Sequence, residues 1–186
     1  MYYQLVDSLL DDAVISALKN GDIIVLRTDT LYGVLARAND DRAVEKVYAA
    51  KRRSQDKSSI VLISSVDQLY DQPTETEKQL MESVWPGPNS VIVKGTRAPL
   101  WLRRDNGSVA YRLPDYAELQ QLIDQVGPLI APSANPEGHV PATTIQEAID
   151  YFGDSVAVFV DGGIVESAKP SGLYRVNDSG EVEKVR

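Results

Sequence analysis

The sequence predicts a single α/β domain built on a mixed β-sheet. Short apolar runs rich in β-branched residues, typical of buried strands, alternate with segments whose apolar residues recur at the helical period. Some strands follow one another with only a turn between them, so both parallel and antiparallel neighbours are expected. At 186 residues the chain is long enough for one domain with a substantial core. The sequence shows no internal repeat and no interdomain linker, so we expect residues 1–186 to form one domain.

The first half of the chain alternates helices with buried strands. A helix over 7–19 carries its apolar residues on one face and stops at Asn20-Gly21, which tolerate the left-handed backbone of a helix end. The wholly apolar run 23–26 predicts a strand buried on both faces. Asp40 or Asp41 is expected to cap the next helix. The further elements expected here are a helix over 41–50, a strand over 59–63, a short helical turn over 66–69, a helix over 74–84 and a strand over 90–93.

The second half is expected to add strands and to close on a hairpin. Trp85-Pro86-Gly87-Pro88 predicts a rigid break, because each proline fixes its own φ and restricts the residue before it. Thr143 or Thr144 is expected to cap a helix, with Glu147 completing a capping box three residues after Thr144. The turn composition of 177–180 predicts a hairpin. The elements expected here are a turn element over 100–102, strands over 109–113, 129–131, 156–160, 173–176 and 182–185, and helices over 116–126 and 144–152.

Composition excludes several kinds of chemistry. The chain has no cysteine, which excludes disulfides, thiolate metal sites and cysteine nucleophiles, and its single histidine, His139, excludes a histidine-rich metal site. The net charge of -8 argues against unspecific binding to nucleic acid. However, Lys and Arg cluster at 42–57 and 94–112 and are absent between Arg112 and Lys169, where nine acidic residues occur. This distribution predicts a local positive pocket on an acidic body.

The chain carries no sign of membrane insertion. No apolar run approaches the roughly 20 residues that a membrane helix needs. The N-terminal residues lack the basic region and apolar stretch of a secretory signal. We therefore expect a cytoplasmic protein with no membrane contact.

Two polar stretches in the first third of the chain suggest a binding site. Thr28-Asp29-Thr30 follows the strand at 23–26, and the basic loop 51–57 follows the helix at 41–50. Hydroxyls facing several cations suit a small polar ligand next to a polyanion such as a nucleoside triphosphate. Each stretch also has a simpler interpretation. Asp and Thr satisfy backbone groups in ordinary turns, and cations complement the dipole at a helix C-terminus.

The phosphate-binding loop of P-loop proteins is absent from this sequence. If phosphate binds, cationic side chains must therefore do most of the holding. Ser133 and Asn135 follow the short strand at 129–131, at the sheet edge where ligands bind in open α/β proteins. An ordinary turn explains these two residues equally well, and Gly162-Gly163 by itself indicates only a turn.

The order and spacing of these motifs are more specific than any one of them. The motifs are Thr-Asp-Thr-x-Tyr-Gly from Thr28, Lys-x-Arg-x-x-x-Lys from Lys51, Trp-Pro-Gly-Pro from Trp85, Ala-x-Arg-x-Pro from Ala110, Ser-Ala-Asn from Ser133 and the Gly-Gly turn after Asp161. Together they resemble the YrdC-like threonylcarbamoyl-AMP synthase family in its short, single-domain bacterial form. The resemblance extends from Gly21 to Arg186 and implies a twisted mixed β-sheet flanked by helices.

The resemblance implies a nucleotidyltransferase that joins L-threonine, bicarbonate and ATP into threonylcarbamoyl-AMP and pyrophosphate, with Mg²⁺ accompanying ATP. The adenylate would serve N6-threonylcarbamoylation of adenosine 37 in tRNA, with transient contact to tRNA or to the threonylcarbamoyl-transferase complex. The residues implied to contact threonine are Thr30, Arg112 and Ser171. Those implied to act on the triphosphate, and so in catalysis, are Lys51, Arg53 and Lys57. The residues implied to line the nucleotide, besides Arg53 and Lys57, are Ser108, Ala131, Ser133, Asn135, Pro141 and Arg186.

The chain departs from the family pattern at several positions. The proline that usually precedes Thr-Asp-Thr is Arg27, and the proline that usually follows the loop lysine is Ser58. A histidine that some members carry five residues past that lysine is Leu62. The Ser-Thr-Val pattern of longer members is replaced by Pro170-Ser171-Gly172, which is typical of the short form.

Elementary chemistry agrees with this assignment. Forming a carbamate and attacking the α-phosphorus requires two negatively charged reactants to be held together, and no covalent enzyme nucleophile. Arg53, Lys57 and Arg112 could supply the neutralising charge. Two alternatives remain. YrdC-like domains also occur in hydrogenase-maturation carbamoyltransferases, although in much longer chains. A non-enzymatic RNA-binding module is the other, against which the acidic net charge counts.

Overall fold

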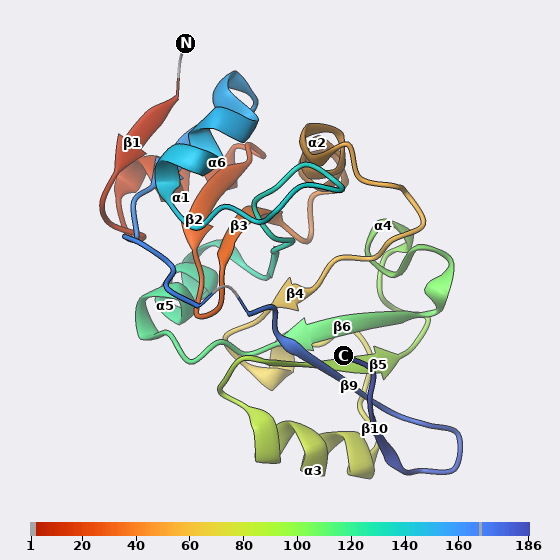
Figure 1. The fold of residues 1–186 in the computed structure, drawn as a ribbon. Helices are drawn as coiled ribbons and strands as arrows, with labels where there is room; N and C mark the ends of the chain where they lie inside the picture. Colours follow the sequence, from red (N-terminus) through yellow and green to blue (C-terminus); the bar gives the residue numbers. More distant parts are fainter. Residues whose placement is uncertain (1–2, 168) are drawn as a thin grey trace.

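The computed structural model describes residues 3–167 and 169–186 (Figure 1). Its strands form one sheet with both parallel and antiparallel neighbours. The strand order is β1-β8-β2-β3-β7-β4-β6-β5-β9-β10. The strands are β1 (Gln4–Val6), β2 (Ile24–Arg27), β3 (Tyr32–Arg37), β4 (Val61–Leu62), β5 (Asn89–Lys94), β6 (Ser108–Arg112), β7 (Leu129–Ile130), β8 (Val158–Val160), β9 (Gly172–Val176) and β10 (Val182–Lys184). Parallel pairs such as β4–β6 occur beside antiparallel pairs such as β2–β3, which confirms the predicted mixed α/β sheet.

Helices cover this sheet in the order that the apolar pattern predicts. The α-helices are α1 (Asp12–Lys19), α2 (Asp41–Lys51), α3 (Glu75–Val84), α4 (Leu100–Arg103), α5 (Ala117–Val126) and α6 (Ile145–Phe152). Short 3-10 turns occupy Val66–Gln68, Arg104–Asn106 and Gly153–Ser155. None of the helices in the described residues is long and apolar enough to cross a membrane.

The N-terminal prediction is wrong in its first residues. The helix starts at Asp12 rather than at residue 7, because the Asp11 side chain accepts a hydrogen bond from the backbone N–H of Ala13 and so caps the helix there. The residues before it form the strand β1, which the sequence analysis did not predict, followed by a turn whose Leu9 is buried. Leu9 and Leu10 extend the apolar period of α1 backwards, and this made the turn resemble a helix.

The predicted N-terminal cap of α2 is confirmed, and that of α6 is confirmed in part. Asp40 caps α2 by accepting from the N–H of Ala43. At α6, Thr144 accepts from the N–H of Glu147, but the expected return contact differs. The Glu147 carboxylate accepts from the N–H and hydroxyl of Thr143 instead of the N–H of Thr144. The carboxylate therefore reaches one residue further back than a capping box requires.

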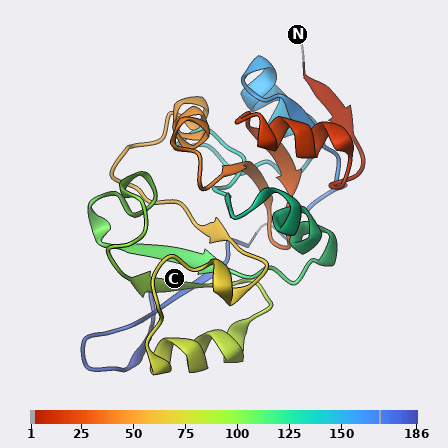
Figure 2. The same cartoon turned by 180° about the vertical axis from the view of Figure 1, so that it is seen from behind.

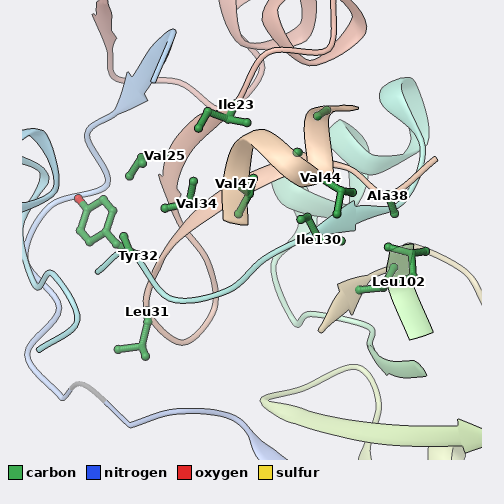
Figure 3. Packing of buried hydrophobic residues seen from close by; sticks show 14 of the residues in the cluster. Ile23, Val25, Leu31, Tyr32, Val34, Ala38, Val44, Val47, Leu102 and Ile130 are labelled. Atoms are coloured by element: carbon green, nitrogen blue, oxygen red, sulfur yellow. The ribbon is translucent and has the colours of Figure 1, made fainter. Parts of the chain in front are cut away.

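The core lies on both faces of β2, as predicted for the run at 23–26. Ile23 and Val25 belong to one buried cluster, and Ile24 and Leu26 belong to the other. Helices α1 and α5 lie side by side over the second cluster (Figure 2), whereas α2 packs on the first through residues such as Val44 and Val47 (Figure 3). The larger cluster extends across the sheet to α3.

The β2–β3 hairpin and the connection from β8 to β9 position the site. β2 and β3 pair antiparallel through a turn over 28–31, and β3 was not predicted as a strand. β8 lies in one half of the sheet and β9 in the other half (Figure 1). Ser171, which directly precedes β9, lines the same cleft as Thr30 of the hairpin turn.

Candidate functional site

One cleft of about 850 Å³ gathers most of the residues predicted for the site. Its walls come from the β2–β3 turn, the loop after α2, the loop after β7 and the strands β5, β6 and β9. The predicted residues that line it are Thr30, Arg53, Ser108, Arg112, Ala131, Ser133, Pro141, Ser171 and Arg186. Lys51, Lys57 and Asn135 are not among the lining residues. Residues far apart in the sequence therefore meet in one hollow.

The floor of the cleft is one face of three neighbouring strands. The side chains that reach it alternate along the strands: Ser108, Ala110 and Arg112 on β6, Ile92 and Lys94 on β5, and Leu173 and Arg175 on β9. The intervening residues Val109 and Tyr111 are buried in the core on the opposite face. A strand period of two therefore turns Arg112 toward the cleft, as expected for a regular strand.

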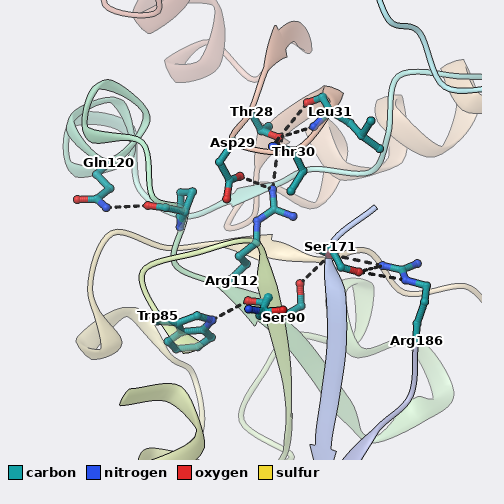
Figure 4. A network of polar contacts seen from close by, with 12 residues as sticks. Thr28, Asp29, Thr30, Leu31, Trp85, Ser90, Arg112, Gln120, Ser171 and Arg186 are labelled. Atoms are coloured by element: carbon teal, nitrogen blue, oxygen red, sulfur yellow. Dashed lines mark hydrogen bonds and ion pairs between the residues drawn. The ribbon is translucent and has the colours of Figure 1, made fainter. Parts of the chain in front are cut away.

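Arg112 is held in a buried ion pair at one end of the cleft (Figure 4). Its Nη2 lies 3.0 Å from Oδ1 of Asp29, and the two side chains are only 4% and 6% exposed. The same nitrogen lies 3.4 Å from the hydroxyl of Thr28, whereas Nε has no hydrogen-bond partner among the described residues. Burial raises the pKa of the Asp29 carboxyl above its usual range, and the neighbouring guanidinium opposes this shift.

The turn before β3 combines a structural threonine with a threonine that lines the cleft. The Thr28 hydroxyl accepts from the N–H groups of Thr30 and Leu31 and donates to the carbonyl of Leu31 at 2.8 Å. Thr28 thus does what the simpler turn interpretation requires. The Thr30 hydroxyl lies 3.1 Å from that of Thr28, and Thr30 lines the cleft. The turn interpretation therefore holds for Thr28, and the ligand contact of Thr30 stays a prediction.

Ser171 lies on the far side of Arg112 and is tied to the C-terminal residue. Its hydroxyl is 3.1 Å from that of the fully buried Ser90. Nη2 of Arg186 donates to the Ser171 carbonyl at 3.1 Å and to its hydroxyl at 3.4 Å (Figure 4). Arg186, predicted on the nucleotide side, therefore sits against the serine predicted on the threonine side.

The basic loop after α2 is exposed and is held by contacts across to another loop. Nη2 of Arg53 donates to the Ser58 carbonyl at 2.8 Å, and Arg53 lines the cleft. The Lys57 ammonium pairs with the Glu137 carboxylate, whose other oxygen accepts from the N–H of Ser54 at 2.7 Å. These contacts lower the pKa of Glu137, first through Lys57. Lys57 is thus engaged by an acid of this chain.

Lys51 is buried at 2% exposure and braces the loop after β7. Its ammonium donates to the backbone carbonyls of Ser133 and Asn135. Burial, with help from the nearby Arg53 charge, lowers the pKa of Lys51 to about 7. The predicted catalytic contact of Lys51 with the triphosphate remains a prediction, and its observed partners are backbone oxygens.

Three of the residues predicted to line the nucleotide, Ala131, Ser133 and Pro141, lie in the loop after β7 and line the cleft, whereas Ser108 reaches it from the floor. Asn135 instead accepts from the Ser133 hydroxyl at 2.6 Å and directs its amide nitrogen to carbonyls within its own loop, at 2.8 and 3.0 Å. Asn135 therefore holds the loop together from within, while its neighbour Ser133 lines the cleft.

Two cations of the floor were missed by the sequence analysis. Lys94 and Arg175 line the cleft, paired with Asp178 and Glu183 respectively at the exposed end. Their strands were predicted, and alternation with Ile92 and Leu173 would have placed them on the cleft face. What the sequence could not supply was the pairing of β5 with β9.

The family model for Sua5/YciO/YrdC proteins, described as telomere recombination, matches residues 16–186. The chain belongs to the Sua5/YciO/YrdC family. A relative from Pseudomonas fluorescens Pf-5 named threonylcarbamoyl-AMP synthase is 31% identical over 169 residues, covering 89% of this chain and 91% of the relative. One of the same name from Yersinia enterocolitica is 33% identical over 152 residues, covering 78% of this chain and 80% of the relative.

A solved family member, P. abyssi Sua5 complexed with L-threonine, matches the structure with a TM-score of 0.88 and 25% identity. The match covers 100% of this chain and 57% of Sua5, so the chain spans little more than half of that protein. The Sua5/YciO/YrdC fold therefore accounts for the whole described sheet.

The departures from the family pattern now have a structural setting. Arg27 donates from Nη1 to the Gly162 carbonyl at 2.9 Å and so fastens the start of the β8–β9 connection. Ser58 lines the cleft and accepts from Asn106 at 3.2 Å. Leu62 is fully buried in the core next to the α1–α5 pair and is not among the residues that line the cleft.

Proposed function

We propose that this chain is a threonylcarbamoyl-AMP synthase, a nucleotidyltransferase that converts L-threonine, bicarbonate and ATP into threonylcarbamoyl-AMP and pyrophosphate. One observation carries the proposal: a buried guanidinium flanked by hydroxyls and an exposed basic loop open into the same cleft. The first suits an amino-acid carboxylate, and the second suits a triphosphate. The names of the relatives from Pseudomonas and Yersinia support the same activity.

The threonine is proposed to lie at the Arg112 end. The carboxylate would accept from the Nη donors of Arg112 that Asp29 leaves free, while Thr30 and Ser171 offer hydroxyls to the rest of the molecule. That Sua5 has been solved with L-threonine supports this substrate for the family fold. The amino group would then point toward the cleft centre, where the other reactants meet.

ATP is proposed to span the cleft from the basic loop to the wall after β7. Arg53 and, once released from Glu137, Lys57 would neutralise the phosphates, and Ser108, Ser133 and Pro141 would face the nucleoside. No aspartate or glutamate is among the residues that line the cleft, and the described residues contain no cluster of three potential metal-binding acids or histidines. Mg²⁺ fits here only as part of MgATP, held by phosphate oxygens and water, where it neutralises phosphate charge.

The chemistry requires positioning and charge neutralisation. The neutral amine of threonine adds to the bicarbonate carbon and water leaves, which yields a carbamate. A carbamate oxygen then attacks the α-phosphorus, and the bond to the bridging oxygen breaks to release pyrophosphate. The cations around the cleft lower the repulsion between the anionic carbamate and the phosphates. No residue of the chain needs to become covalently attached.

The product is proposed to serve tRNA threonylcarbamoylation in the cytoplasm, with tRNA or the transferase complex as a transient partner. The deciding experiment measures pyrophosphate release from ATP while threonine, bicarbonate and Mg²⁺ are omitted in turn, with mass identification of the adenylate. Release that requires all of them supports the proposal. Salt-sensitive tRNA binding without turnover would favour an RNA-binding module. Turnover of carbamoyl phosphate in place of bicarbonate and threonine would favour the carbamoyltransferase alternative.

A further inference from the structure

Asp29 is a buried acid that the proposed chemistry leaves unused. It lies in the turn between β2 and β3, and its carboxylate faces Arg112 of β6 and the backbone of Asp115 in the loop after β6. Arg186 is the next charge beyond Arg112. Asp29 is not among the residues that line the cleft. It therefore reaches a ligand only through Arg112.

A contribution to the stability of the fold does not by itself explain the Asp29–Arg112 ion pair. Both side chains are more than nine-tenths buried, and the loss of hydration of two buried charges offsets most or all of their attraction. An apolar pair of similar volume is often as stable or more stable. The pair is better explained by what it does to the geometry of Arg112.

The contacts divide the guanidinium into a fixed and a free part. Nη2 is engaged by Asp29 at 3.0 Å and faces the Thr28 hydroxyl at 3.4 Å. Nε is buried and has no hydrogen-bond partner among the described residues, so the nitrogen that remains for a ligand in the cleft is Nη1. Because a guanidinium is planar, fixing one nitrogen sets the direction of the others. Asp29 thus aims the remaining donors at the cleft.

We propose that Asp29 is a positioning residue that acts through Arg112, holding the guanidinium in the orientation that grips the substrate carboxylate. The proposal rests on the proposed placement of threonine at Arg112. Asp29 also offsets the charge of Arg112, and Arg186 is the further cation at this end of the cleft. A triphosphate would be drawn to Arg53 and, once released from Glu137, to Lys57 at the other end.

The test is threonine binding by the isosteric variant Asp29→Asn, measured by calorimetry with and without ATP. We expect the Kd for threonine to rise roughly tenfold, with the Kd for ATP within about twofold of wild type. Arg112→Lys and the double variant complete the cycle. If Asp29 acts through Arg112, Asp29→Asn adds little to the loss already caused by Arg112→Lys. An unchanged threonine Kd in Asp29→Asn, or losses that multiply in the double variant, would overturn the proposal.

A matched control separates positioning from stability. Glu77 is an equally buried carboxylate, 5% exposed, that completes the capping box of α3 away from the cleft. Glu77→Gln is expected to lower the melting temperature and to leave threonine binding unchanged. A loss of threonine binding in Glu77→Gln as large as in Asp29→Asn would show that Asp29 acts only through stability.

A second arm needs no variant. Burial raises the pKa of Asp29, and protonation of its carboxyl removes the charge that holds Arg112, so the threonine Kd of the folded wild-type protein should rise as the pH is lowered. Pyrophosphate release that fails at every pH, with threonine binding intact, would contradict the proposed function and leave the role of Asp29 standing. A threonine Kd that falls as the pH is lowered would contradict the role of Asp29 alone.

Discussion

The two ends of the cleft hold their cations in opposite ways. At one end Arg112 is buried, ion-paired with the equally buried Asp29 and fixed before any ligand arrives. Beside the other end, Lys57 is half exposed and pairs with Glu137 across two loops, without itself lining the cleft. Buried pairs set geometry, whereas exposed pairs are weak and exchange readily with solvent or with another anion. The cleft thus combines a preformed end, proposed for threonine, with an adjustable end, proposed for phosphates.

Arg112→Lys should give the largest effect, because it removes the planar guanidinium group at the preformed end. Lysine keeps the charge but cannot reproduce two parallel donors, and its ammonium cannot serve Asp29 and a carboxylate in the same geometry. We expect the KM for threonine to rise by about two orders of magnitude, while the affinity for ATP stays nearly constant.

Steady-state titrations of each substrate test this expectation. Arg37→Lys is the control, since Arg37 donates to the carbonyl of Val126 and is not among the residues that line the cleft. An unchanged threonine KM in Arg112→Lys, or equal losses for both substrates, would move Arg112 away from the threonine.

Arg53→Ala should give the next largest effect, at the adjustable end. A lost charge-assisted contact to phosphate is expected to cost about 2–3 kcal/mol of transition-state stabilisation, and therefore to reduce kcat/KM for ATP by some two orders of magnitude. The hydrogen bond from Arg53 to the Ser58 carbonyl is also lost, so the free energy of unfolding should fall by about 1 kcal/mol.

The neighbouring Arg52 supplies a control of the same charge. It is exposed, lies at the C-cap of α2 and is not among the residues that line the cleft. Arg52→Ala should therefore keep near-normal pyrophosphate release. Equal losses in the two variants would indicate that the loop acts through its net charge and not through a contact of Arg53.

The same contrast explains what could be predicted from the sequence. Arg112 was placed correctly because a strand has a fixed period, and β6 is regular. The helix caps and the strand at 23–26 follow equally local rules. Asp29 could be recognised as part of a turn, but its pairing with Arg112 joins residues far apart in the chain. The contacts of Lys51 and Lys57 likewise depend on the loop that holds Glu137, whose path no local pattern determines.

Lys51 is a buried cation, and Lys51→Met should change how the free energy of unfolding depends on pH. Because the pKa of Lys51 is lowered to about 7, the unfolded chain binds more protons than the folded chain above that pH. The free energy of unfolding should therefore rise with pH from about 7 to about 9.5, by at most about 1.4 kcal/mol per pH unit from this group. The methionine variant should lack this rise.

Denaturant titrations at several pH values measure the difference in slope. The limit near pH 9.5 avoids the tyrosines, among them Tyr111, whose pKa is raised by burial. Lys46→Met on the same helix is the control for the removal of an ammonium group, because the Lys46 side chain is half exposed. Equal slopes in wild type and Lys51→Met would mean that Lys51 keeps an ordinary pKa in the folded protein.

Glu137→Gln should give the smallest effect and tests whether the adjustable end competes with its own acid. The Glu137 carboxylate accepts from Lys57 and from the N–H of Ser54, so it occupies donors that a phosphate group would use. Its lowered pKa keeps it ionised across the neutral range. Removing the charge should free Lys57 and tighten ATP binding by no more than about fivefold, because an exposed ion pair contributes little. The threonine Kd should not change.

Glu45→Gln, which removes an exposed partner of Arg104 from another ion pair, should leave both affinities unchanged. Weaker ATP binding in Glu137→Gln would show that Glu137 holds the loop in its productive position, and the basic end would then be as preformed as the end that holds Arg112.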